Sequence, residues 1–154
     1  YGYLADEKNN TLWETWNGDG NDEGCGHCHP MFGSVVAWFY HSLAGIKPDQ
    51  SDPGMKHFYI EPMIVPDLKY CRATYDSQYG KISSDWKIDE NGNLNLKIEV
   101  PANTSATVII PDWGGRTVLE SGKPVSEVSN IVIDKVDSAR MKVSSGVYHF
   151  VILK

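Results

Sequence analysis

The sequence has little of what a membrane protein or a nucleic-acid-binding protein needs. Its longest apolar run, residues 147–153, is interrupted by His149 and is far too short to cross a bilayer. The net charge is −6 over 154 residues, and the lysines and arginines are scattered, so no basic surface for a nucleic acid is indicated. We therefore expect no nucleic-acid partner and no membrane partner. A neutral ligand, or none, suits this charge better.

Cysteine is also scarce, with Cys25, Cys28 and Cys71 alone. An odd count argues against a complete disulfide framework, and it leaves the redox compartment open. The chain begins at Tyr1 with neither a methionine nor a signal-peptide pattern, so we expect a processed product or an excised fragment. None of these features indicates where in a cell the protein resides.

The N-terminal part predicts a long loop followed by a helix. Residues 1–33 are rich in glycine, asparagine and aspartate, which is typical of a loop. The apolar residues of 35–44 then predict a helix, with Ser34 as its N-cap and Gly45 as its end. Because apolar side chains cover a broad part of this helix, it needs partner helices, and the chain predicts no others. This is the strongest internal indication that a further part of the protein precedes this chain.

From about residue 56 the pattern changes to short strands in which polar and apolar residues alternate. Turn-forming residues separate them at 89–92, 101–104 and 120–124. The predicted strands cover residues 58–62, 70–75, 80–89, 94–100, 106–110, 128–134 and 146–153. Strands at this spacing predict a mainly β fold: an antiparallel β-sandwich, preceded by the long loop and one or two helices.

The first candidate for chemistry is Glu14, which stands between Trp13 and Trp16. Apolar neighbours desolvate a carboxylate and raise its pKa, which is how glycosidases adjust an acid or a base. The indoles could also face a sugar. The alternative is a glutamate on a solvated loop with both tryptophans in the core, and the segment by itself does not decide between the two.

A metal site is not expected in the loop. Cys25, His27, Cys28 and His29 are all potential ligands, but structural zinc sites draw their ligand pairs from separated places, and this cluster is too tight for one ion. A Cys25–Cys28 disulfide and two free thiols both stay open. The acidic run that begins at Asn17 lacks the glycine and the glutamate that a calcium loop needs at its sixth and twelfth positions. We therefore predict no metal and no cofactor.

Five motifs occur in an order that is more specific than any one of them. They are TLWETWNG at 11–18, HPMFGSV at 29–35, PGMKHFYIEP at 53–62, ATYDSQYGKI at 73–82 and PANTSATV at 101–108. Together they resemble the closing segment of bacterial α-L-rhamnosidases of glycoside hydrolase family 78. The resemblance covers nearly the whole chain.

The resemblance implies a fold, a reaction and a set of site residues. The family fold is an (α/α)6 barrel flanked by β-domains, and the reaction is the hydrolysis of terminal α-L-rhamnosides with inversion. Glu14 matches the family's general base, which activates water opposite the general acid. His29 matches a histidine near the bound rhamnose, where it would hydrogen-bond a sugar hydroxyl or orient the base. Trp13 and Trp16 would form a wall of the pocket or pack beneath it.

The same resemblance predicts how the chain is divided. Residues 1–47 would be the last strip of the catalytic barrel, and residues 48–154 the C-terminal β-sandwich domain. The general acid lies upstream in the family, so this chain alone is not expected to be active. The expected partners are a rhamnosylated glycan or glycoside and the remainder of the barrel.

Two points qualify the match. Cys28 stands where the family commonly has asparagine, so the loop before His29 departs from the pattern. The alternative function is that of a non-catalytic accessory domain, either structural or carbohydrate-binding, with surface tryptophan and tyrosine side chains as the sugar platform.

Overall fold

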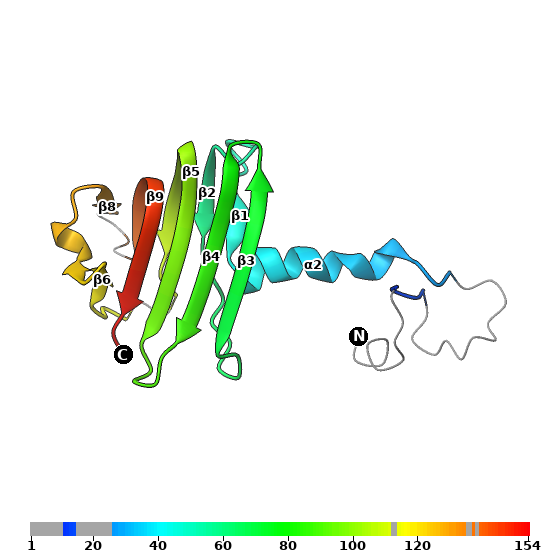
Figure 1. Cartoon of the computed structure of the whole chain (residues 1–154), viewed down its shortest axis with the longest axis horizontal. Coiled ribbons are helices and arrows are strands. Elements are labelled where there is room, and N and C mark those ends of the chain that lie inside the picture. Colours follow the sequence, from blue (N-terminus) through cyan, green and yellow to red (C-terminus); the bar gives the residue numbers. More distant parts are fainter. Residues whose placement is uncertain (1–10, 15–25, 112–113, 135–136, 138) are drawn as a thin grey trace. The chain divides into compact units, whose positions relative to one another are not determined.

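The computed structural model describes residues 11–14, 26–111, 114–134, 137 and 139–154 (Figure 1). The chain divides into two compact units, Tyr1–Phe39 and Tyr40–Lys154. The predicted domain boundary between residues 47 and 48 stays a prediction. No helix in the described ranges is long and apolar enough to span a membrane.

The predicted helix is a run of three short helical segments. A 3-10 turn, η1 (Pro30–Gly33), leads into α2 (Ser34–Trp38) and then into a π-helical turn, η2 (Phe39–Leu43). None of its residues is buried, and the apolar side chains Val36, Trp38 and Phe39 are 45–52% exposed. The predicted apolar surface is therefore present, and the described residues do not cover it.

The predicted N-cap at Ser34 is wrong. The Ser34 hydroxyl donates to the carbonyl of Met31 at 3.3 Å, and Ser34 is itself the first residue of α2. The side chain that caps the run is His29, whose ring accepts a hydrogen bond from the backbone N–H of Met31. The helical path begins earlier than predicted because Pro30, with its fixed φ, favours the first helical position.

The second unit is the predicted β-sandwich. Its strands are β1 (Ile46–Pro48), β2 (His57–Ile60), β3 (Tyr70–Ser77), β4 (Gly80–Ile88), β5 (Leu94–Ile109), β6 (Val118–Glu120), β7 (Lys123–Pro124), β8 (Ile131–Ile133) and β9 (Arg140–Ile152). The two long strands, β5 and β9, pair with each other along their length and connect two sets of partners (Figure 1). One set is β3, β4, β6 and β7, and the other is β1, β2 and β8.

The structure corrects the prediction for residues 101–104. These residues do not separate two strands; they form a bulge inside β5, where the register with β9 shifts between Val100 and Ser105. Asn103 has φ +61°, and the hydroxyl of Thr104 donates to the carbonyl of Pro101 at 2.7 Å. These residues do turn the backbone locally, as the sequence predicts. Pairing with β9 on both sides of the bulge nevertheless keeps the strand continuous. β9 correspondingly begins at Arg140, six residues before the predicted start.

One pairing is not antiparallel. β2 runs parallel to β5, with Phe58 opposite Ala106, whereas the other paired strands are antiparallel. The predicted turns at 89–92 and 120–124 are confirmed as the β4–β5 and β6–β7 connections. The predicted alternation in β4 is also confirmed, because Ile82, Ser84 and Trp86 are fully buried and their neighbours are not.

Two buried side chains of β4 cap the end of the helical run. The indole Nε1–H of Trp86 donates to the carbonyl of Leu43, and the hydroxyl of Ser84 donates to the carbonyl of Ala44, each at 2.7 Å. The last carbonyls of a helix have no partner within the helix, and burying them unpaired is costly. Ser84 is thus a buried polar residue whose hydroxyl group satisfies a carbonyl at the helix end.

Two backbone N–H groups cap the carbonyls on either side. Met63 N–H donates to Ser42 at 2.8 Å, and Glu61 N–H donates to Gly45 at 2.9 Å. Gly45 has φ +75°, and a Cβ atom there would lie 2.2 Å from the backbone of Glu61 and Pro62. The predicted helix end at Gly45 is confirmed, and glycine is required there both for its conformation and for space.

Gly45→Ala should destabilise the chain far more than Gly122→Ala. Both glycines have positive φ, +75° and +83°, but a Cβ at Gly122 meets nothing within 4 Å. The left-handed conformation alone costs an alanine about 1–2 kcal/mol. Gly45→Ala should exceed that cost because backbone must also move. Thermal unfolding of the two variants measures the difference, and equal losses would contradict the role given to the close approach.

Ser84→Ala should lower the free energy of unfolding by about 1–3 kcal/mol, because it leaves the buried Ala44 carbonyl without its donor. Ser83→Ala is the matched control, since Ser83 is the neighbouring residue of β4 and is only half-buried. We expect the control to stay within about 0.5 kcal/mol of the unchanged chain. Denaturant unfolding of both variants tests the cap, and similar effects at the two positions would argue against it.

Candidate functional site

Glu14 is joined to Gly26 by two reciprocal hydrogen bonds. The backbone N–H of Glu14 donates to the carbonyl of Gly26, and the N–H of Gly26 donates to Oε2 of the Glu14 carboxylate, both at 2.9 Å. One carboxylate oxygen is therefore held by the backbone. The other, Oε1, accepts no such bond from the residues that the structure describes. An oriented carboxylate with one available oxygen can accept a proton from a bound water.

Trp13 is stacked on His27. The two ring centroids are 4.4 Å apart and the planes are inclined by 15°. Trp13 is half-buried, whereas His27 is exposed. Nearly parallel aromatic rings at this distance attract each other, so His27 covers one face of the indole and restricts its movement.

His29 is bound to the same segment through its backbone. Its N–H donates to the carbonyl of Leu12 at 2.7 Å, which places residues 26–29 alongside residues 12–14. Its ring Nδ1 accepts from the backbone N–H of Met31 at 3.3 Å. A neutral imidazole that accepts at one nitrogen donates at the other, so Nε2 carries the proton and can donate to a ligand hydroxyl.

The structure thus brings three of the predicted site residues, Trp13, Glu14 and His29, onto one paired segment. The fourth, Trp16, lies outside the described residues, and so does Cys25. His27 was considered in the sequence only as a metal ligand. Its contact with Trp13 gives no local sequence signal, because the two residues are far apart in the sequence and are brought together by the pairing of residues 12–14 with residues 26–29.

Cys28 and Cys71 are free thiols. For Cys28, the structure therefore agrees with the free thiol and not with a disulfide to Cys25. Within the described ranges, no three histidine, cysteine, aspartate or glutamate side chains come together as metal ligands.

The pKa shifts of the second unit have structural causes. Burial, and then the nearby Asp85, raise the pKa of the Cys71 thiol. Hydrogen bonds from Asn93, first from its backbone and then from its side chain, lower the pKa of the Asp89 carboxyl in the β4–β5 turn. Asp89 belongs to the β4–β5 turn and Cys71 to β3, where Cys71 pairs with Trp86 of β4.

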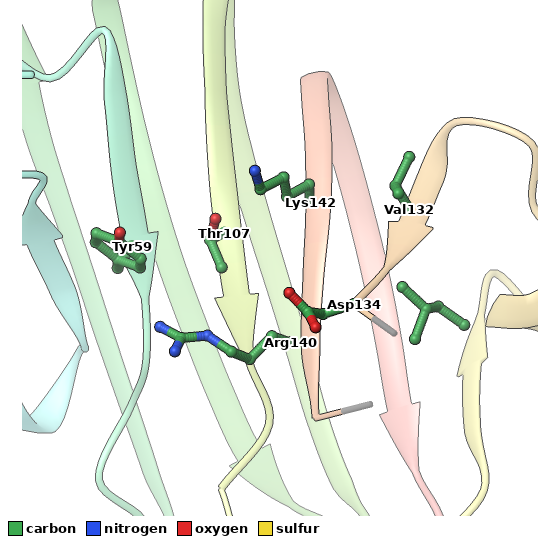
Figure 2. Close-up of a pocket in the computed structure, with 7 residues that line it drawn as sticks. Tyr59, Thr107, Val132, Asp134, Arg140 and Lys142 are labelled. Atoms are coloured by element: carbon green, nitrogen blue, oxygen red, sulfur yellow. The ribbon is translucent and has the colours of Figure 1, made fainter. Parts of the chain in front are cut away.

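The second unit carries two adjacent hollows on its outer surface. One, of about 550 Å³, is lined by residues of β2, β5, β8 and β9, including Tyr59, Thr107 and Lys142 (Figure 2). Figure 2 shows Arg140 extending toward Tyr59, and its guanidinium carbon lies 6.0 Å from the ring centroid. A second hollow, of about 480 Å³, shares Tyr59 and Arg140. An aromatic ring beside charged and hydroxyl groups is a combination that suits the binding of a small polar ligand.

Comparison with known proteins bears on both units. Residues 45–124 match a family model described as the bacterial α-L-rhamnosidase C-terminal domain. An α-L-rhamnosidase of Formosa agariphila is 28% identical over 156 residues, which is 96% of this chain and 16% of that protein. One of Streptomyces avermitilis is 33% identical over 117 residues, or 72% of this chain and 11% of that protein.

Solved structures give the same result. An α-L-rhamnosidase from Dictyoglumus thermophilum aligns with a TM-score of 0.83 and 32% identity, covering 99% of this chain and 17% of that one. The Streptomyces avermitilis α-L-rhamnosidase, solved in complex with L-rhamnose, aligns with a TM-score of 0.77 and 28% identity, covering 97% and 14%. This chain therefore spans less than a fifth of the length of these relatives.

The protonation of His29 can be tested directly. In the neutral form of the His29 ring, ¹⁵N NMR should find the proton on Nε2, because Nδ1 accepts from Met31. His57 is the internal comparison, since both of its ring nitrogens lie within 3.0 Å of hydroxyl groups that can donate or accept. A proton on Nδ1 of His29 would contradict the cap.

Proposed function

The chain belongs to the family of bacterial α-L-rhamnosidase C-terminal domains, and we propose that it is the C-terminal part of a longer glycoside hydrolase that removes terminal α-L-rhamnose. The substrate would be a rhamnosylated glycan or glycoside. The observation that carries the proposal within this chain is the Glu14 carboxylate, held at Oε2 by the N–H of Gly26, while among the described residues no hydrogen bond reaches Oε1.

In this proposal Glu14 is the general base of an inverting hydrolysis. Its available oxygen takes a proton from a water molecule as that water attacks the anomeric carbon, while a second carboxyl group protonates the leaving oxygen on the opposite side of the sugar. The two carboxyl groups of inverting enzymes stand about 6.5–9.5 Å apart, which leaves room for the water. Orientation favours this role, because the base must point at the water before the reaction begins.

The remaining site residues would bind the sugar. His29, with its proton on Nε2, would donate to a rhamnose hydroxyl, while its Nδ1 is occupied by Met31. Trp13 would offer the indole surface that His27 leaves uncovered, and Trp16 is proposed to line the same pocket. Flat indoles suit the apolar faces of a pyranose ring.

We assign the general acid to the remainder of the barrel, outside this chain. The chain alone would then bind or pack but not hydrolyse, since inversion needs two carboxyl groups. A non-catalytic sugar-binding role of the β-sandwich is the competing function, and the hollows around Tyr59 and Arg140 are where it would act.

Glu14→Gln in the intact enzyme should reduce the turnover of an aryl α-L-rhamnoside by about 10²–10⁴-fold, because glutamine keeps the shape of the side chain but cannot accept the proton. Glu90→Gln is the matched control: Glu90 is an exposed glutamate in the β4–β5 turn. Steady-state kinetics measure both variants, and proton NMR of the first product identifies its anomer.

Near-normal turnover in Glu14→Gln would contradict the base, and retention of the anomeric configuration would contradict the mechanism. A separate titration of rhamnose against residues 40–154, the second unit, addresses the competing function. Binding that persists without residues 1–39 and is lost in Tyr59→Ala would favour the accessory role.

A further inference from the structure

We infer that the dipeptide Gly26–His27 is a positioning element of the catalytic site: its backbone N–H sets the orientation of the Glu14 carboxylate, and its imidazole fixes the Trp13 indole. The inference rests on the proposed function, because it gives a task to the neighbours of the proposed base. Neither Gly26 nor His27 touches the reacting atoms in this account. Both act through the residues to which they are bonded or stacked.

The contacts of the dipeptide with residues 13 and 14 are directional. Gly26 both accepts from the Glu14 N–H and donates to the Glu14 Oε2, so a single residue holds the backbone and the side chain of the same glutamate. Two such bonds fix the carboxylate relative to its own main chain. A hydrogen bond from an N–H to a carboxylate is stronger than one between neutral groups, and this strength restricts rotation of the carboxyl group.

The inferred role of residue 26 depends on its backbone N–H and does not depend on the absence of a side chain. A Cβ atom at Gly26 would lie 3.6 Å from Oε2 of Glu14, which is ordinary van der Waals contact. Its φ is also outside the left-handed region. Alanine therefore fits at this position and keeps the donor, whereas proline removes the donor. The two substitutions separate the hydrogen bond from the space.

His27 acts on the adjacent residue of the same segment. Its ring lies nearly parallel to the Trp13 indole at 4.4 Å and so occupies one face of it. A sugar that packs against Trp13 must then use the remaining face or edge. Because Trp13 precedes Glu14 in the chain, the stack and the reciprocal hydrogen bonds hold two neighbouring residues through one dipeptide.

Cys28, the next residue of the loop, provides an internal control. It is an exposed free thiol, and it makes none of the contacts that join residues 26–29 to residues 12–14. A substitution there changes the loop sequence without removing a bond to Trp13 or Glu14. Cys28→Ser should therefore keep the kinetics of the unchanged enzyme.

The first experiment compares Gly26→Pro with Gly26→Ala in the intact enzyme on an aryl α-L-rhamnoside. We expect kcat to be about 10- to 100-fold lower for proline than for alanine, because the base loses its orientation. KM should differ much less, since the sugar contacts are unchanged. Equal kcat values for the two variants would overturn the role of the N–H.

The second experiment compares His27→Ala with His27→Phe, which restores a flat ring for the stack. We expect KM to rise about 2- to 10-fold more for alanine than for phenylalanine, in line with the strength of one aromatic pair. If both variants lose affinity equally, stacking is not the cause and the role of His27 is overturned. Thermal unfolding of each variant checks the fold. Should Gly26→Pro fail to fold, hydrogen exchange of the Gly26 N–H in the unchanged enzyme decides its role, and exchange at the rate of a free amide would overturn it.

The outcomes separate this inference from the proposed function. If Glu14→Gln loses turnover while both pairs of loop variants behave alike, the base stands and the positioning element is rejected. If Glu14→Gln keeps its turnover, the proposed base is rejected first, whatever the loop variants show.

Discussion

The end of the helical run depends on four consecutive carbonyl groups, those of Ser42, Leu43, Ala44 and Gly45, each of which accepts a hydrogen bond from β4 or from the residues after β2. No residue of the segment from Pro30 to Leu43 is buried, but Tyr40 packs against the core and Ala44, just after the segment, is fully buried. The donors are two buried side chains of β4 and two backbone groups that follow β2. Because an unpaired buried carbonyl costs far more than a typical hydrogen bond contributes, these bonds fix where the helix stops.

The same principle operates at the candidate site on a smaller scale. Residues 12–14 and 26–29 are joined by two hydrogen bonds between backbone groups and one between a backbone N–H and a carboxylate. The Glu14 side chain takes part in this pairing. A carboxylate that belongs to a backbone hydrogen-bond pattern is oriented before any substrate arrives, which is the property that a general base requires. The sandwich, in contrast, places its perturbed carboxyl and thiol groups in turns and partly buried positions that account for their pKa values.

The similarity to α-L-rhamnosidases extends over both units, because one relative aligns with 96% of the chain. The family model covers residues 45–124, which lie within the sandwich unit, while the residues that we propose for catalysis lie before it. The order of five motifs carried the resemblance because it extends over both units, whereas any single motif is short. Local rules also predicted the helix end at Gly45, the β4–β5 turn and the alternation of β4, since each depends on residues close together in the chain.

What the sequence by itself determined is therefore the mainly β class, the turns with left-handed glycines, and the family. The tertiary structure alone decided the continuity of β5 through residues 101–104, the parallel pairing of β2 with β5, and the contacts of His27 with Trp13 and of Gly26 with Glu14. The physical reason is the same in each case. Hydrophobic periodicity and turn propensity act over a few residues, whereas a strand is continued, or a carboxylate oriented, by partners that approach from distant parts of the chain.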